Sequence, residues 1–120
     1  MKKTLNAIRF AINGIRYSFT NERNVRIEIF SSILVILVGF LLKISSLHWL
    51  IIILNISFVL TAELINTAIE KFADFVSKEI NPAIKIIKDI AASAVIISVI
   101  AAAFCGLIIF VPYILKLVNF

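Results

Sequence analysis

The chain is organised around the stretch AELINTAIEKFAD (residues 62–74), which continues the apolar run of residues 44–62. At about 100° of helical turn per residue, the polar side chains of this stretch fall within roughly 80° of one another. These side chains, the polar stripe, are Glu63, Asn66, Glu70 and Asp74. Carboxylates are costly at membrane depth unless they face a cavity, a cation or a partner, so the polar stripe is a candidate site.

The composition places the chain in a membrane. Of its 120 residues, 62% are hydrophobic, and the mean hydropathy is +1.09. Both values lie far above those of a soluble domain of this length. Three segments carry no full charge: residues 29–42, 44–62 and 90–115. Because about 20 apolar residues cross a hydrocarbon core of about 30 Å, the second and third segments suffice alone.

The first apolar segment is shorter than a full span. We expect it to begin near Arg26 or Ile27, with Arg26 and Lys43 extending their charged ends toward the head groups. The expected architecture is an all-α membrane protein that forms a single domain over residues 1–120. Its three spans are predicted over approximately residues 27–43, 47–75 and 84–115.

Approximately residues 4–20 are predicted to form an amphipathic helix on the membrane surface. Apolar residues recur there at steps of three and four, with basic and amide side chains between them. The apolar residues are Leu5, Ile8, Ile12, Ile15 and Phe19. The alternative is that this segment serves only as a signal for insertion.

Residues 21–28 form a dense polar patch that ends where the first apolar segment begins. Such a patch is usually a solvated connector. The alternative is a role in the site, because Glu22 and Glu28 share the interfacial depth expected for Glu70 and Asp74. The acids can then meet across the helices.

The distribution of lysine and arginine predicts the orientation. Six precede the first span, one lies between the first and second, four lie between the second and third, and one follows the third. By the positive-inside rule, the N-terminus and the second connection are cytoplasmic, and the C-terminus is outside. The net charge is +5, but the basic residues flank membrane segments, so anionic lipid rather than nucleic acid is the expected partner.

Small residues recur every four positions in the third span. This small-residue stripe consists of Ala94, Ser98, Ala102 and Gly106. Small side chains let helix backbones approach closely, so close helix packing is the predicted role of the stripe.

The polar groups gathered at one membrane face suit a metal and a polyphosphate. They are the acids Glu22, Glu28, Glu63, Glu70, Asp74 and Asp89, the amide Asn66, and the cations Lys85 and Lys88. Magnesium usually takes one or two carboxylates, water and substrate phosphates, and lysine neutralises phosphate charge. Glu63 is the deepest carboxylate and can accept a proton from a lipid hydroxyl that attacks phosphorus. A proton relay or a small transporter with an intramembrane acid fits this spacing nearly as well.

Two segments resemble a known family. The run ELINTAIEK (residues 63–71), with Asp74 after it, and the run KDIAASAV (residues 88–95) are similar to the signature of the bacterial integral-membrane lipid kinases. That family includes diacylglycerol kinase and undecaprenol kinase. The resemblance extends from about Ile8 to Pro112 and implies a three-span subunit with a surface helix. It further implies a homotrimer with active sites between subunits at the cytoplasmic face of the bacterial inner membrane, using ATP and Mg²⁺.

The resemblance also implies roles for individual residues. Glu63 resembles the general base, Asn66 a residue that orders the site, and Glu22 with Glu70 the metal ligands. The nucleotide-binding residues that it implies are Glu28, Glu70, Asp74, Lys88 and Asp89. The preferred lipid stays open, because residues 22–24 and 88–92 resemble the undecaprenol branch, whereas Glu28 resembles the diacylglycerol branch.

Two other classes of function compete with a lipid kinase. A small proton-coupled transporter explains acids in a membrane helix, but it leaves Lys88 and Asp89 without a purpose and favours acids near the middle of the membrane. A non-catalytic assembly factor would use the small-residue stripe to pack against a larger complex. Such a factor would not respond to ATP.

Overall fold

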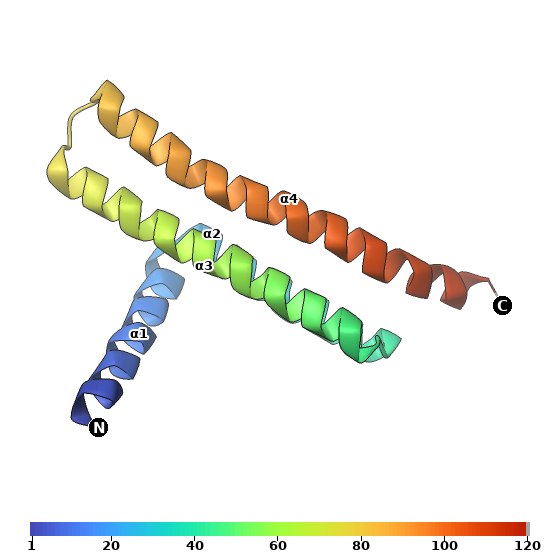
Figure 1. Cartoon of the computed structure of the whole chain (residues 1–120). Coiled ribbons are helices and arrows are strands. Elements are labelled where there is room, and N and C mark those ends of the chain that lie inside the picture. Colours follow the sequence, from blue (N-terminus) through green and yellow to red (C-terminus); the bar gives the residue numbers. More distant parts are fainter. Residues whose placement is uncertain (120) are drawn as a thin grey trace.

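The computed structural model describes residues 1–119 and consists of four helices joined by short connections (Figure 1). In chain order they are α1 (Lys2–Asn21), α2 (Arg23–Leu42), α3 (Ser46–Val76) and α4 (Pro82–Val118). Helices α2, α3 and α4 are long and apolar enough to cross a membrane. The prediction of an all-α protein with an N-terminal helix and three candidate spans is therefore confirmed.

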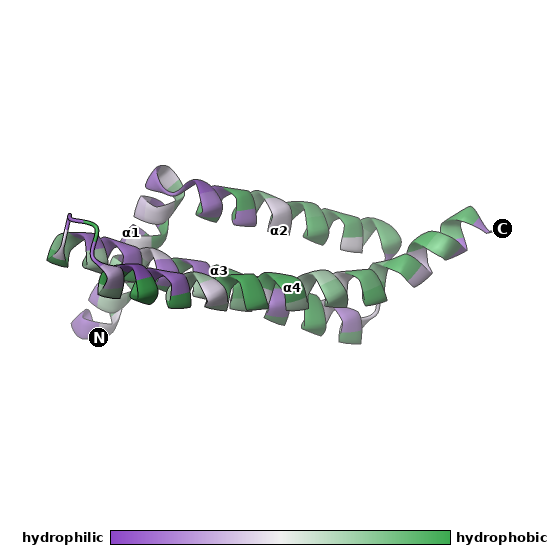
Figure 2. Ribbon diagram, turned by 90° about the horizontal axis from the view of Figure 1, so that it is seen from above, coloured by the Kyte–Doolittle hydropathy of each residue, from purple (hydrophilic) through white to green (hydrophobic). Residues whose placement is uncertain are grey.

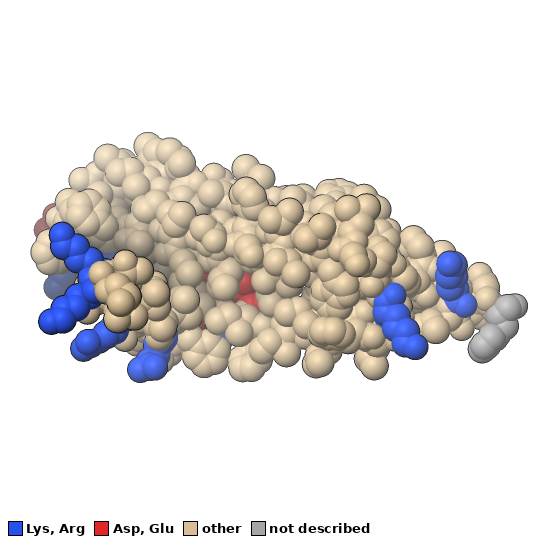
Figure 3. All heavy atoms as spheres, turned by 60° about the horizontal axis from the view of Figure 1, so that its bottom comes forward, with Lys and Arg blue, Asp and Glu red and all other residues tan. Residues whose placement is uncertain are grey.

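Helices α3 and α4 run side by side in opposite directions, and α1 points away from them (Figure 1). Helix α1 and the α3–α4 connection lie at one end of the molecule, and the C-terminus lies at the other (Figures 1 and 2). Hydrophilic residues concentrate at the first of these ends (Figure 2). Lysine and arginine side chains also gather at that end, on the face that Figure 3 shows. The polar groups of the chain are thus concentrated at one end of the bundle.

The turn between α2 and α3 is closed by close packing. Lys43 ends α2 in a left-handed backbone conformation with φ 52°, and its N–H donates to the carbonyls of Gly39 and Phe40. The ring of Trp49 lies over Gly39 so closely that a Cβ there would be 2.7 Å from Cη2 of the ring. A glycine is therefore required where the two helices meet.

Helix α4 is held to this turn by the hydroxyl of Tyr113. That hydroxyl accepts a hydrogen bond of 3.0 Å from the Ser45 N–H and lies 2.9 Å from Nδ1 of His48. Beneath it, Ile44, Ile52 and Ile109 form a buried apolar cluster. The three candidate spans are thus joined at the end of the molecule farthest from α1.

At the opposite end, a single residue separates α1 from α2. Glu22 has an extended backbone with φ −114° and ψ 116°, and its N–H donates to the Ser18 carbonyl. The Arg26 guanidinium donates to the carbonyls of Phe19 and Thr20 at 3.0 and 2.9 Å, which satisfies groups left unpaired at the end of α1. Val25 is fully buried at this elbow. The elbow thereby fixes where the Glu22 side chain projects.

Candidate active site

Three of the four residues in the polar stripe of α3 are buried or half-buried, and Asp74 at its end is exposed. Glu63 and Asn66 are each 6% exposed, and Glu70 is half-buried one turn further on. Nδ2 of Asn66 donates a hydrogen bond of 3.1 Å to Oε1 of Glu70. The Asn66 Oδ1 atom is buried and, within residues 1–119, has no hydrogen-bond partner. An acceptor oxygen is therefore left free beside two carboxylates.

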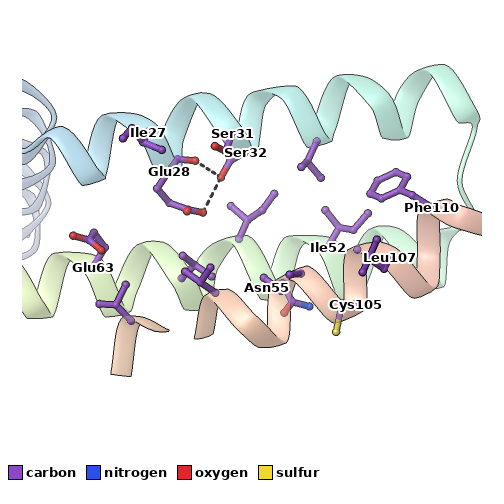
Figure 4. A pocket seen from close by; sticks show the side chains of 18 of the residues that line it. Ile27, Glu28, Ser31, Ser32, Ile52, Asn55, Glu63, Cys105, Leu107 and Phe110 are labelled. Carbon is purple, nitrogen blue, oxygen red and sulfur yellow. Dashed lines mark hydrogen bonds between the residues drawn. The ribbon is translucent and has the colours of Figure 1, made fainter. Parts of the chain in front are cut away.

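Helix α2 adds a third carboxylate, opposite the two of α3. Glu28 is half-buried, and the hydroxyl of Ser32 lies 2.7 Å from the Glu28 carbonyl oxygen and 3.3 Å from its carboxylate Oε1 (Figure 4). The side chain of Asn24, in the first turn of α2, faces the Glu63 carboxylate, and both residues line the groove described below. The charge of Glu63 also interacts with those of Glu22, Glu28 and Glu70. Four carboxylates from the α1–α2 elbow, α2 and α3 therefore form one acidic cluster.

A groove of about 890 Å³ begins at this cluster and runs between α2, α3 and α4. Figure 4 shows Glu28 projecting into it from α2, with Glu63 on α3 toward the same end. The remaining lining is mainly apolar and includes Val59, Val99, Ala102, Leu107 and Phe110. Its α4 wall runs from Val95 to Ile114, which is about 28 Å at a rise of about 1.5 Å per residue. We call it the intramembrane groove.

The small-residue stripe does not pack as predicted in its second half. Ala102 and Gly106 line the intramembrane groove, and a Cβ added at Gly106 would meet no atom within 4 Å. The physical reason is the arrangement of the helices, since α4 packs extensively on α3 and α2 packs on α3 much less. Within one chain, the small residues therefore widen a groove.

Comparisons with known proteins match the sequence of this chain to one family. The family model described as prokaryotic diacylglycerol kinase matches residues 9–110. The undecaprenol kinase of Bacillus subtilis (strain 168) is 36% identical over 99 residues, which are 82% of this chain and 80% of the relative. The chain belongs to the prokaryotic diacylglycerol kinase family. It is a lipid kinase.

Two other relatives are named diacylglycerol kinase. The protein of Synechocystis sp. is 35% identical over 112 residues, which cover 92% of this chain but only 64% of the relative. The protein of Helicobacter pylori (strain J99) is 34% identical over 104 residues, which cover 86% of this chain and 80% of the relative. Membership of a kinase family implies the use of ATP, and the three apolar helices indicate a multi-pass bacterial membrane protein.

The remaining predicted site residues form a second cluster in this kinase. Asp74, near the end of α3, pairs with Lys88 of α4, and Asp89 pairs with Lys85 at 2.6 Å. All four residues lie near the α3–α4 connection. Among residues 1–119, no hydrogen bond or ion pair joins this cluster to the acidic cluster. One chain of the kinase therefore carries the predicted site in two parts.

Two residues next to the acidic cluster were not predicted as site residues. Lys71 of α3 forms an ion pair of 3.2 Å with Glu22, and its ammonium lies 5.8 Å from the ring centroid of Tyr17. Asn24 faces Glu63 from the first turn of α2. The sequence signal for both was their position beside a predicted site residue, Lys71 after Glu70 and Asn24 two residues after Glu22.

The oxygen atoms of the acidic cluster fit magnesium bound together with a nucleotide. Glu22 and Glu70 offer carboxylates, and Asn66 offers its unpartnered Oδ1 beside Glu70. Residues 1–119 hold no group of three or more His, Cys, Asp or Glu side chains placed to bind a metal by themselves. Magnesium usually takes one or two carboxylates and completes its shell with water and phosphate oxygens. These oxygen atoms therefore suit a metal ion that binds together with the phosphates of a nucleotide.

Proposed function

We propose that this kinase transfers the γ-phosphoryl group of ATP to the hydroxyl of a membrane lipid, with Glu63 as the general base. The observation that carries the proposal is the position of Glu63 at the head of the intramembrane groove. A lipid alcohol whose tail fills the apolar groove presents its hydroxyl to that carboxylate. Glu28 lies on the opposite wall and would help to orient the hydroxyl.

In the proposed reaction, Glu63 accepts the proton of the lipid hydroxyl while the hydroxyl oxygen attacks the γ-phosphorus of ATP. The new P–O bond forms as the bond to the bridging oxygen breaks, and ADP leaves with the electron pair. Asn24, which lines the groove with Glu63, would help to orient the Glu63 carboxylate, and the Asn66 amide donates to Glu70. Such positioned proton transfer typically contributes a factor of about 10²–10⁴ to the rate.

Magnesium, when bound, supplies positive charge that offsets the charge of the phosphates. Glu22 and Glu70 would hold it, with the free Oδ1 of Asn66 beside them. Lys88 and Asp89 would bind the nucleotide, with Asp74 and Glu28 in support. Lysine suits this role because its ammonium offsets phosphate charge.

We further propose a homotrimer with active sites between subunits. In one chain, Lys88 and Asp89 are paired with neighbours and do not reach the acidic cluster. A second copy can bring these residues to Glu63 of the first. Many large apolar side chains of α2, α3 and α4 are exposed on the single chain, which leaves surface for lipid and for other copies.

The proposed orientation places the N-terminus and the active site in the cytoplasm and the C-terminus outside. Helix α1 and the α3–α4 connection lie at the same end of the molecule, and ten of the 12 lysine and arginine residues precede the first span or lie between the second and third. The positive-inside rule assigns such an end to the cytoplasm. ATP is available on that side.

The substrate is diacylglycerol or undecaprenol. Relatives with both names match the chain at 34–36% identity. An apolar groove discriminates weakly between hydrocarbon tails, so the lining does not favour either lipid. A proton-coupled transporter is less well supported, because Glu28 and Glu63 are the only carboxylates among the residues of 1–119 that line the groove, and the lining beyond them is mainly apolar.

The variant Glu63→Gln tests the proposal. It keeps the shape of the side chain and removes its basicity, so transfer of labelled phosphate to lipid should fall by about 10²–10⁴. Nucleotide binding and oligomeric state should match those of the parent. Glu79→Gln, at an exposed position in the α3–α4 connection, is the matched control and should retain full turnover. Parental turnover in Glu63→Gln would contradict the assignment of the base.

A further inference from the structure

One cation, Lys71, contacts the acidic cluster and has no role in the proposed reaction. Lys71 projects from α3 to the α1–α2 elbow, where its ammonium lies 3.2 Å from Oε1 of Glu22. Of the ion pairs in residues 1–119, this is the one that involves any of the four clustered carboxylates. The ammonium therefore stands against a carboxylate that we propose as a metal ligand.

The surroundings of Lys71 allow it to move. Its side chain is 53% exposed, whereas that of Glu22 is 23% exposed. The second contact of the ammonium is with the ring of Tyr17, at 5.8 Å from the centroid. A lysine side chain has a flexible four-carbon stem and binds phosphate as a point charge. The ion pair can thus open without unfolding a helix.

The pair also has an electrostatic purpose when no metal is bound. The charge of Glu63 interacts with the charges of Glu22, Glu28 and Glu70, which come from the elbow, α2 and α3. Like charges at such range repel, and a single ammonium reduces that repulsion. The same ammonium competes with any other cation for the Glu22 carboxylate.

We propose that Lys71 neutralises the charge of Glu22 when no metal is bound. When the metal and the nucleotide bind, the Lys71 ammonium leaves Glu22 and contacts the nucleotide phosphates. This inference rests on the proposed function, because it takes Glu22 as a ligand of the metal. Lys71 is a positioning residue for Glu22 in the metal-free protein and a phosphate-binding residue in the loaded one. Divalent cations then bind well only together with a nucleotide, which limits binding of metal alone.

The test measures binding of Mn²⁺ to the full-length protein in detergent micelles by the electron paramagnetic resonance signal of free Mn²⁺. The variants are Lys71→Met, which removes the charge, Lys71→Arg, which keeps it, and the exposed control Lys78→Met. Each is titrated with Mn²⁺ alone and with Mn²⁺ plus a non-hydrolysable ATP analogue. Oligomeric state is checked for every variant.

The effect of Lys71→Met on the affinity for Mn²⁺ is expected to have opposite signs in the two titrations. Without nucleotide, Lys71→Met should bind Mn²⁺ about two- to fivefold more tightly than the parent, the range that corresponds to loss of one partly exposed ion pair. With the nucleotide analogue it should bind more weakly than the parent, since an ammonium is lost from the phosphates. Lys71→Arg and Lys78→Met should behave like the parent in both titrations.

Three outcomes would overturn the inference. Parental affinity of Lys71→Met in both titrations would show that Lys71 competes with no metal. Weaker binding in both would indicate that Lys71 only supports the fold of the elbow. If the parent itself binds no Mn²⁺ even with the nucleotide analogue, the magnesium site of the proposed function fails, and the inference fails with it.

Discussion

Gly106 offers a direct way to narrow the intramembrane groove. It lies on α4 and lines the groove, and a Cβ added there would meet no atom within 4 Å. The series Gly106→Ala, Gly106→Val and Gly106→Leu therefore adds hydrocarbon to open space. Replacement of a helical glycine also removes a propensity cost of about 1 kcal/mol, so the variants should fold at least as well as the parent.

The expected effect on the lipid substrate follows from the volume that each variant removes from the groove. Leucine adds four carbon atoms to Gly106. A displaced tail returns to the hydrocarbon of the micelle and not to water, so the cost is that of overpacking, typically about 1–3 kcal/mol. The loss is therefore up to about 3 kcal/mol, or roughly a hundredfold rise in the lipid KM. Alanine adds one carbon atom to open space and should raise the lipid KM much less than leucine does.

The assay is phosphate transfer in mixed micelles with the lipid mole fraction varied at saturating ATP. Ala101→Leu is the matched control, because Ala101 is an exposed position on α4 that does not line the groove. The KM for ATP should stay at the parental value throughout the series. A parental lipid KM in Gly106→Leu would refute the groove as the tail site. Loss of the oligomer in Gly106→Leu would show that a helix of another copy fills this space.

Three further predictions concern the metal site, the α2–α3 turn and access to the groove. Glu70→Gln should raise the magnesium concentration needed for half-maximal turnover by on the order of 10- to 100-fold, and a parental magnesium response would count against Glu70 as a ligand. Gly39→Ala should lower the free energy of unfolding by about 1–3 kcal/mol because its Cβ would lie 2.7 Å from the Trp49 ring, whereas Gly14→Ala, with no atom within 4 Å, should not. Cys105, the one cysteine of the chain, lines the groove, so a saturating lipid substrate should slow its alkylation, and equal rates with and without lipid would contradict the tail site.

The number and approximate bounds of the helices could be predicted from the sequence because they depend on local properties. High hydropathy over about 20 residues identifies a membrane span, and apolar residues that recur at steps of three and four positions identify an amphipathic helix. The start of α2 at Arg23 was harder to predict from the sequence, since the apolar segment begins six residues later at Ile29. Burial of Val25 and the contacts of Arg26 at the elbow extend the helix into the polar patch.

The polar stripe was visible for the same local reason, since helical periodicity alone places Glu63, Asn66 and Glu70 on one face. The role of Lys71 could not be predicted from the sequence, because the positive-inside rule already explains a lysine at the end of an apolar helix. Its pairing with Glu22 depends on the angle at which the α1–α2 elbow meets α3. Hydropathy and periodicity within single segments do not determine that angle.

The most direct test of the central claim is magnesium-dependent transfer of labelled phosphate from ATP to diacylglycerol and to undecaprenol, measured side by side with the purified protein in detergent micelles. The proposed function predicts a phosphorylated product from at least one of the two lipids, which also identifies the preferred lipid. Absence of product from both, in a sample shown to be folded and assembled, would contradict the account of Glu63 at the head of the intramembrane groove.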